Sequence, residues 1–240
     1  MDPRGYAIKK RLQNIERILS IVSGKGGVGK STIASILSLA LIDKGYKVGL
    51  LDLDFHGPSC HIILGISDFT YEEEHGIKPY IHEGISFASI YPFVKEEPVS
   101  LRGMDMSNAI TEFLAILNWS PLDFLVIDMP PSMGDPFLDI VKYIPNAEHI
   151  IITTSSRLST ATVSRLIKYL QEQNYSIVGL IENMSTHKQD EARKLAEHYG
   201  IRHLCVIPYD ETLEESLGHP KRLRHTRVYN ELSKIIEAIT

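Results

Sequence analysis

The sequence predicts one α/β domain over residues 1–240, with a mostly parallel sheet flanked by helices on both faces. Short apolar runs alternate with longer amphipathic segments, which is the order of elements typical of this class. Several of the apolar runs lack polar alternation, as expected for strands that are covered on both faces. No linker or low-complexity tract interrupts the pattern, and a chain of 240 residues is within the range of a single domain.

Strands are expected wherever a short apolar run lies between turn residues. Val, Ile, Leu and Phe dominate these runs, and β-branched and aromatic side chains suit a pleated sheet. In chain order, the predicted strands are Ile18–Val22, Val48–Leu51, Ile85–Ile90, Phe124–Ile127, Ile150–Thr153, Ile177–Ile181 and Leu204–Ile207.

Helices are expected between these strands, where apolar residues recur every three or four positions. The predicted helices are Thr32–Asp43, Ser107–Leu117, Pro136–Ile144, Thr160–Gln173 and Asp190–Tyr199. A final helix carries an apolar stripe at Val228, Leu232, Ile235, Ile236 and Ile239. The stretch at approximately 67–98 is rich in acidic residues, Gly and Pro, and we interpret it as an irregular insertion rather than a second domain.

Composition narrows the class of protein. Hydrophobic residues make up 43% and charged residues 23% of the chain, as in ordinary globular proteins. The net charge of −5 does not favour nucleic-acid binding. Two cysteines cannot form a disulfide framework, the start lacks the apolar core of a signal peptide, and the weakly polar run Ser31–Ile42 is short of the roughly 20 residues that span a bilayer. We therefore expect a cytoplasmic protein without nucleic acid or stable membrane anchoring.

The clearest motif lies where the first predicted strand ends and the first helix opens. Gly24, Gly29, Lys30 and Ser31 match the phosphate-loop pattern. Glycines let backbone N–H groups converge on phosphate oxygens, the helix N-terminus attracts anions, and the hydroxyl suits Mg²⁺. We expect nucleotide binding by Gly24, Gly26, Gly27, Val28, Gly29, Lys30, Ser31 and Thr32.

The same glycines allow a second interpretation. Gly24, Gly26 and Gly29 also spell a dinucleotide-binding fingerprint, and Asp52 and Asp54 lie near the distance at which that fold keeps its ribose-binding acid. An NAD-dependent oxidoreductase is therefore an alternative of another reaction class.

Other residues disfavour the dinucleotide interpretation. A dinucleotide site has no use for Lys30 followed by a hydroxyl residue. Asp128 closes the apolar run Phe124–Ile127, as a magnesium-water ligand does in a phosphate-loop enzyme. The loop also carries an extra lysine, Lys25. A Mg²⁺-dependent ATPase is the favoured interpretation.

Several blocks of the sequence resemble the Mrp branch of the MinD/ParA/Mrp ATPases, which carry a deviant Walker A motif. The resemblance implies a single-domain P-loop NTPase, and the shared order of the blocks makes it specific. The blocks are GKGGVGKST at residues 24–32, LDLDFHGPS at 51–59, LRGM at 101–104, Trp119, DFLVIDMPPSMGD at 123–135 and GLIENMS at 179–185.

The resemblance also implies catalytic roles. Lys25 would be the signature lysine that reaches across a homodimer to the partner's phosphates, and Lys30 would contact the phosphates of its own site. Asp54 would orient or deprotonate the attacking water. Taken alone, acids after a strand are also common as solvated end groups, so Asp52 and Asp54 have a purely structural interpretation as well.

For the cofactors, the resemblance implies ATP or ADP with Mg²⁺. Ser31, Asp52 and Asp128 would hold the Mg²⁺, the two acids through water, and Asn183 would contact the adenine edge. The chain lacks the Asn-Lys-x-Asp motif that reads guanine, which favours ATP over GTP.

Two departures from the Mrp pattern decide the expected subtype. The Cys-x-x-Cys pair that usually follows the Glu-Asn-Met segment is replaced by residues 186–191, which contain no cysteine, and residues 130–135 read PPSMGD. The chain thus resembles cysteine-pair-free Mrp/MinD-type ATPases, including HypB-type proteins. We expect nickel insertion into nickel–iron hydrogenase, with a metallochaperone or apo-metalloenzyme client as partner. The alternative is a Mrp-type iron–sulfur cluster assembly or carrier ATPase, and a further alternative is a MinD/ParA-like positioning ATPase.

Direct metal binding is disfavoured by the spacing of the soft ligands. His56, Cys60 and His61 cluster beside the second motif, and His203 and Cys205 are expected on one face of a buried strand. None of these spacings matches an established zinc pattern, so we interpret these residues as packing or surface residues.

Overall fold

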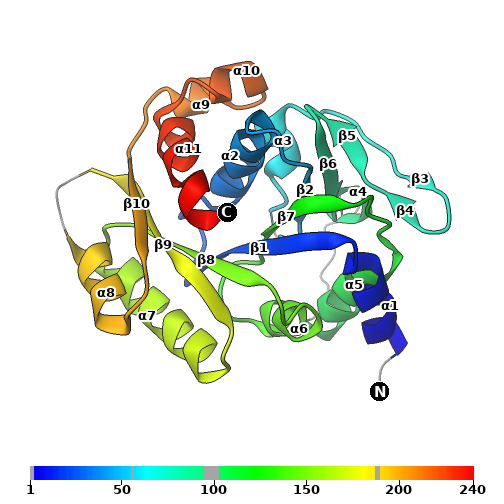
Figure 1. The fold of residues 1–240 in the computed structure, drawn as a ribbon, viewed down its shortest axis with the longest axis horizontal. Helices are drawn as coiled ribbons and strands as arrows, with labels where there is room; N and C mark the ends of the chain where they lie inside the picture. Colours follow the sequence, from blue (N-terminus) through cyan, green and yellow to red (C-terminus); the bar gives the residue numbers. More distant parts are fainter. Residues whose placement is uncertain (1–2, 56, 95–102, 187–189) are drawn as a thin grey trace.

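The chain folds around an eight-stranded sheet, whose order is β10-β9-β8-β1-β7-β2-β6-β5 (Figure 1). A computed structural model describes residues 3–55, 57–94, 103–186 and 190–240. Every neighbouring pair of strands is parallel except β5–β6. The strands are β1 (Ile15–Ser23), β2 (Val48–Asp52), β5 (Tyr80–His82), β6 (Ile85–Ser89), β7 (Leu122–Asp128), β8 (Glu148–Thr153), β9 (Ser176–Ser185) and β10 (His203–Pro208).

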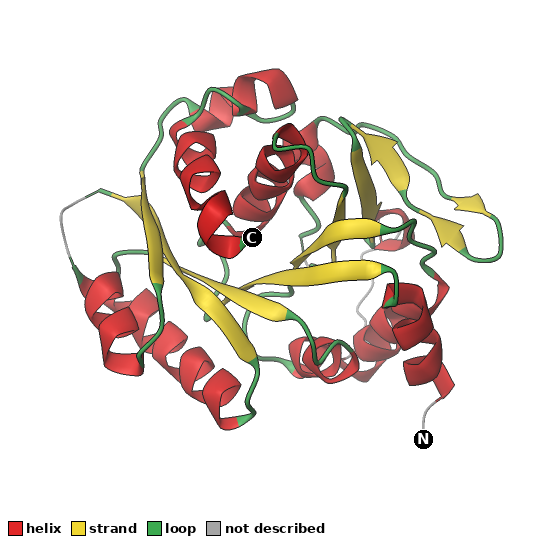
Figure 2. Ribbon diagram, viewed as in Figure 1, coloured by secondary structure: helices red, strands yellow, loops and turns green. Residues whose placement is uncertain are grey.

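Helices cover both faces of the sheet, which confirms the predicted α/β class (Figures 1 and 2). One face carries α2 (Lys30–Asp43), α3 (Cys60–Leu64), α9 (Leu213–Ser216), α10 (Pro220–Leu223) and α11 (Arg227–Ile239). The other carries α1 (Pro3–Leu12), α5 (Gly103–Ile116), α6 (Asp135–Tyr143), α7 (Arg157–Glu172) and α8 (Glu191–Tyr199). The short helix α4 (Tyr91–Val94) follows β6.

The core consists of two apolar clusters, one on each face of the sheet. Helix α2 packs on β1, β2 and β7 and also against α11, its neighbour on the same face, so residues such as Leu37 and Leu41 are fully buried. The predicted stripe of α11 faces this cluster, and its members are at most 5% exposed. Burying a side chain of this kind stabilises the fold by roughly 1.5–3 kcal/mol, so α2 is anchored firmly behind the loop that precedes it.

The stretch after residue 67 is more regular than the sequence predicts. Strands β3 (Glu72–Glu73) and β4 (Ile77–Lys78) pair as an antiparallel ribbon, and β5 and β6 form a hairpin on the sheet edge. The hairpin turn is Glu83-Gly84, with φ of 50° and 83°. Positive φ at both central residues is the geometry of a two-residue hairpin turn, and a Glu-Gly turn is a weak sequence signal. Residues 95–98 of the predicted insertion lie outside the described residues.

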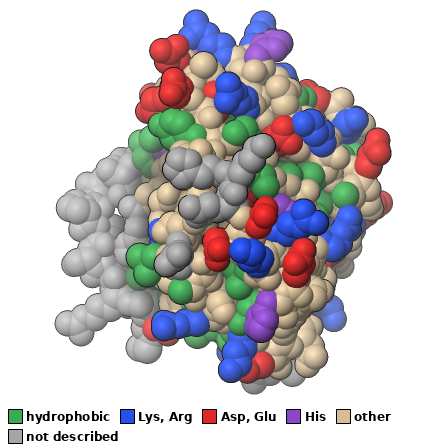
Figure 3. Space-filling view, turned by 90° about the vertical axis from the view of Figure 1, so that its left-hand side faces the viewer, with side chains coloured by type: hydrophobic (Ala, Val, Ile, Leu, Met, Phe, Trp, Pro, Cys, Tyr) green, Lys and Arg blue, Asp and Glu red, His purple; other side chains and the backbone are tan. Residues whose placement is uncertain are grey.

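The surface has two features that bear on partners. Within the described ranges, no helix is both long and apolar enough to cross a membrane. On the face over β10 and α8, Lys and Arg side chains are interspersed with Asp and Glu side chains (Figure 3). That face therefore presents mixed charge rather than a patch of one sign.

Candidate nucleotide and metal site

The phosphate-binding loop follows β1 and ends where α2 begins at Lys30. Gly29 caps the helix with φ of 86°, a backbone conformation that residues other than glycine rarely adopt. Gly24 packs against α7, where an added Cβ would lie 2.6 Å from the carbonyl carbon of Thr162. Both glycines are thus fixed by the geometry, and both belong to the predicted motif.

Side chains on either side of the loop hold its backbone in place. The Asn183 amide, from β9, donates a 2.8 Å hydrogen bond to the Val28 carbonyl. The Ser23 hydroxyl donates a 2.7 Å hydrogen bond to the Lys25 carbonyl. A Cβ on Gly29 would lie 2.4 Å from the Asn183 amide nitrogen. Asn183 therefore braces the loop, a contact that the sequence did not predict.

Two buried carboxylates end adjacent strands beside this loop. Asp52 and Asp128 are register partners in the β2–β7 pair, and both are fully buried. Burial raises the pKa of Asp128 to about 6, although the nearby Lys30 charge and the Ser31 hydroxyl bond oppose the shift. Burial and the Asp128 charge raise the pKa of Asp52 well above its usual value. Two like charges in a buried site create a strong attraction for a cation.

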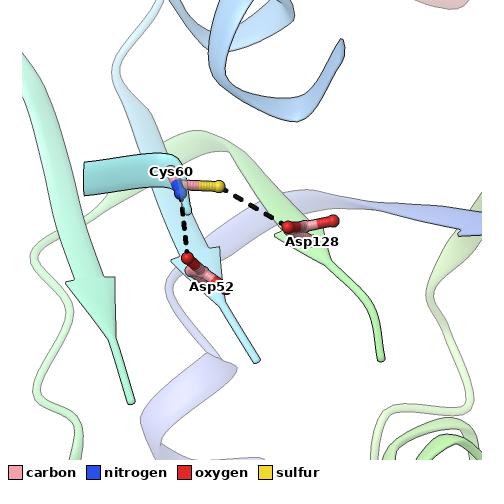
Figure 4. A group of neighbouring side chains, drawn as sticks. All are labelled: Asp52, Cys60 and Asp128. Atoms are coloured by element: carbon pink, nitrogen blue, oxygen red, sulfur yellow. Dashed lines mark hydrogen bonds between the residues drawn. The ribbon is translucent and has the colours of Figure 1, made fainter. Parts of the chain in front are cut away.

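The loop after β2 folds back over these carboxylates. The Asp52 carboxylate accepts a 3.2 Å hydrogen bond from the backbone N–H of Asp54. It accepts a second, of 3.1 Å, from the backbone N–H of Cys60 (Figure 4). The Asp54 carboxylate accepts a 3.3 Å bond from the Gly57 N–H, and Asp54 is 9% exposed. The Cys60 thiol is fully buried and donates to an Asp128 oxygen at 3.6 Å. Burial raises the pKa of this thiol well above its usual value.

A pocket of about 250 Å³ lies beside the first turn of α2, which follows the phosphate-binding loop. It is lined where β9 and β10 end and α11 begins, by residues that include Thr32, Asn183, Met184, Tyr209 and Asp210. Its place beside the loop is suitable for a nucleotide base. Sequence reasoning missed Tyr209 and Asp210, although polar residues after a predicted strand are the signal that found Asp52 and Asp128.

Among the described residues, Cys60 is the one soft candidate that belongs to a group of possible metal ligands, together with Asp52 and Asp128, whereas His61, His203 and Cys205 belong to none. His61 stacks on Tyr91 at 3.9 Å between ring centres, and His56 lies outside the described residues. His203 and Cys205 do not share a face: charged groups near His203 belong to β9 and α8, whereas those near Cys205 belong to α11. A register shift of β10 between the two residues explains this correction.

The donor atoms near the loop suit Mg²⁺, which prefers oxygen ligands. The Ser31 hydroxyl, Asp52 and Asp128 lie together, and one Asp128 oxygen is buried without a hydrogen-bond partner among the described residues. The strand–loop–helix unit with Lys30, together with this oxygen cluster, defines a P-loop NTPase, a class of enzyme that binds a nucleoside triphosphate with Mg²⁺.

The chain belongs to the ParA family. The family model, described as NUBPL iron-transfer P-loop NTPase, matches residues 14–240. This match rules out the NAD-dependent oxidoreductase, because a P-loop NTPase uses its glycines for a triphosphate.

Relatives in the same family carry a consistent name. The iron-sulfur cluster carrier protein of Saccharolobus solfataricus is 36% identical over 237 residues, covering 91% of this chain and 80% of the relative. The iron-sulfur cluster carrier protein of Methanocaldococcus jannaschii is 35% identical, covering 97% of this chain and 87% of the relative. These names favour the iron–sulfur alternative, and the HypB-type nickel interpretation is not supported.

Solved structures show the same fold. A nucleotide-binding protein from Archaeoglobus fulgidus, in complex with ADP and with Co found, is 28% identical with a TM-score of 0.80, covering 94% of this chain and 95% of that one. The cell division ATPase MinD of Pyrococcus furiosus has a TM-score of 0.69 at 22% identity, covering 94% of this chain and 100% of that one. The MinD likeness shows the fold alone and carries no positioning role to this chain.

Proposed function

We propose that this chain is a Mg²⁺-dependent ATPase of the cytoplasm that acts as a homodimer and drives iron–sulfur cluster delivery, with the cluster held by a partner protein. The observation that carries the ATPase proposal is the buried Asp52–Asp128 pair beside the phosphate-binding loop. The names of the relatives support the iron–sulfur part.

The residues of the loop bind and orient the triphosphate. Backbone N–H groups of residues 24–31 surround the phosphates, and the side chain of Lys30, only 5% exposed, places its charge in a region of low dielectric. Ser31, Asp52 and Asp128 would hold the Mg²⁺, which when bound neutralises phosphate charge. Lys30 then compensates the charge that remains on the transferred phosphoryl group.

Asp54 is the proposed residue for positioning the attacking water. It follows Asp52 by two residues and is held at the edge of the same cluster by the Gly57 N–H. A carboxylate there accepts a hydrogen bond from water and orients it toward a phosphate.

Asn183 and the pocket beside it are the proposed site for the base. The amide nitrogen of Asn183 is committed to the Val28 carbonyl, which leaves its carbonyl oxygen as the group that faces a ligand. An acceptor at that position suits the exocyclic amine of adenine and supports ATP as the substrate.

The two cysteines support a cluster held outside this chain. Cys60 is buried against the carboxylates, and Cys205 lies on β10, with β9, β8 and β1 between its strand and β7. Burial raises the pKa of Cys205 to about 12. An iron–sulfur cluster needs several thiolates close together, so a metallochaperone or apo-metalloenzyme client is the proposed holder.

Asp54→Asn tests the proposal in two parts. The variant keeps the size of the side chain, so ATP should still bind, while hydrolysis should fall by about 10²- to 10⁴-fold because the positioned base is lost. Cluster transfer from a loaded scaffold protein to an apo-acceptor should accelerate with the wild type and ATP, but not with the variant.

The outcomes separate the two parts. Hydrolysis by the variant at the wild-type rate would reject the role of Asp54. A wild-type protein that hydrolyses ATP but leaves cluster transfer unchanged would reject the iron–sulfur role and retain the ATPase.

A further inference from the structure

Cys60 stands out because the proposed ATPase gives its thiol no role. Its sulfur is fully buried at the start of α3, 3.6 Å from an Asp128 oxygen and 3.8 Å from the Ser31 carbonyl oxygen. Mg²⁺ is a hard cation that selects oxygen ligands, so it leaves a thiol protonated. A thiol at this point therefore adds a property that an oxygen-only site lacks.

Together with the two carboxylates, the thiol forms a compact set of ligand atoms. One atom each of Asp52, Cys60 and Asp128 lies within 4.8 Å of the others, and all three residues are buried (Figure 4). A second observation points to a ligand: Asp128 Oδ2 accepts from the Cys60 thiol, whereas Oδ1 of the same fully buried carboxylate has no hydrogen-bond partner among the described residues.

We propose that Asp52, Cys60 and Asp128 form a site for one thiophilic divalent cation, of the class of Zn²⁺ and Co²⁺, with the Cys60 sulfur as a direct ligand. The site overlaps the place of the nucleotide's Mg²⁺. It goes beyond the proposed ATPase, because it requires neither nucleotide nor hydrolysis.

The spacing of the sulfur and the carboxylate fits this assignment. Zinc binds sulfur at about 2.3 Å and carboxylate oxygen at about 2.0–2.2 Å, so two such ligands at a tetrahedral angle lie about 3.5–3.7 Å apart. The Cys60 sulfur and the Asp128 oxygen are 3.6 Å apart. The Asp52 carboxylate is already held beside them by the Cys60 N–H, and a shift on the order of 1 Å brings it into range.

Binding exchanges a proton for the cation. The Cys60 S–H bond breaks as the sulfur–metal bond forms, and the proton leaves to the buffer. The metal keeps its oxidation state, and no other reactant is needed. Mg²⁺ does not bind the sulfur and leaves the Cys60 thiol protonated. Binding of Zn²⁺ therefore releases one proton, that of the thiol, which binding of Mg²⁺ does not release.

Cobalt titration of the full-length, untagged, nucleotide-free protein tests the assignment. We expect a thiolate-to-cobalt charge-transfer band in the near ultraviolet, with one Co²⁺ bound per chain. Cys60→Ser should lose the band and weaken Co²⁺ binding by about tenfold or more, while Mg²⁺ binding with ADP stays within about twofold. Cys205→Ser, which changes the other cysteine, should behave as the wild type.

X-ray absorption of the zinc-loaded Cys205→Ser protein keeps the test independent of the Cys60 variant. A shell with one sulfur at about 2.3 Å supports the site, since Cys60 is the only thiol in that variant. A shell of nitrogen and oxygen alone, an unchanged charge-transfer band in Cys60→Ser, or bound Co²⁺ without such a band in the wild type would overturn the proposal.

Discussion

Acidification should destabilise this protein through one buried histidine, His149 on β8. Its side chain is fully buried, its Nδ1 is bonded to the Ser20 hydroxyl, and its Nε2 has no partner among the described residues. Burial lowers the pKa of His149 from 6.5 to about 4. The unfolded chain therefore binds the proton first as the pH falls, and the neutral ring stabilises the folded state in full only above the unfolded pKa.

The size of the effect follows from the shift. A difference of about 2.5 pKa units corresponds to about 3 kcal/mol of unfolding free energy, lost progressively between about pH 6.5 and pH 4. At pH 5 the loss attributable to His149 is about 2 kcal/mol. The carboxyl of Asp128 acts in the opposite direction, because its pKa is raised and protonation stabilises the folded state.

A difference measurement isolates the histidine from the carboxylates. Urea unfolding of the wild type and His149→Asn should be compared at about pH 7.5 and pH 5, since the amide keeps a partner for Ser20 but does not titrate. The stability loss on acidification should be about 2 kcal/mol smaller in the variant. His219→Asn, at an exposed histidine, is the matched control. Equal losses in the wild type and His149→Asn would refute the assignment.

Three further predictions concern the nucleotide site. Asp128→Asn should raise the unfolding free energy of the nucleotide-free protein by about 1–3 kcal/mol in urea at pH 7.5, because it removes a buried charge whose pKa is raised from 3.8 to about 6. The same variant should lose Mg²⁺-dependent hydrolysis. A variant less stable than the wild type would contradict this prediction. Gly29→Ala should lose ATP binding by calorimetry, whereas Gly45→Ala, which has a similar φ of 92° and open space, should keep it; retained binding in the first would show that the loop tolerates the side chain. Lys25→Ala should lose ATP-dependent dimerisation in light scattering, whereas Lys44→Ala, at the far end of α2, should dimerise normally; a normal Lys25→Ala dimer would reject the proposed contact between subunits.

Elements with a strong local signal were predicted well from the sequence. The buried strands and the phosphate-binding loop are each marked by a pattern within a few consecutive residues. The structure has these strands, and the loop lies between β1 and α2 as expected. Helix α1 was missed because only Ile8 and Leu12 of it are buried, which is too few apolar positions to set a period. The register shift between His203 and Cys205 depends on the pairing of β10 with β9, and the sequence of β10 alone does not predict it.

The site was predicted in parts, and the contacts between the parts were not. The aspartates could be found because each follows an apolar run, so parallel strands bring them to one edge of the sheet. The contact between Cys60 and Asp128 joins residues 68 positions apart, and the bond from Asn183 to Val28 joins residues 155 apart. The spacing of residues along the chain does not predict such contacts, because they depend on how helices and loops pack over the sheet.

The cluster at the ends of β2 and β7 also links the proposed chemistry to the surface. The Asp52 carboxylate lies where a cation is expected and accepts hydrogen bonds from the backbone of Asp54 and Cys60. A change of charge at the cluster therefore acts directly on the loop between them. That loop carries Phe55, which lines two apolar pockets of about 250 and 190 Å³ together with residues of α4, α5 and α6. We therefore expect a cation that binds at Asp52 to change the position of this loop, and of Phe55 with it.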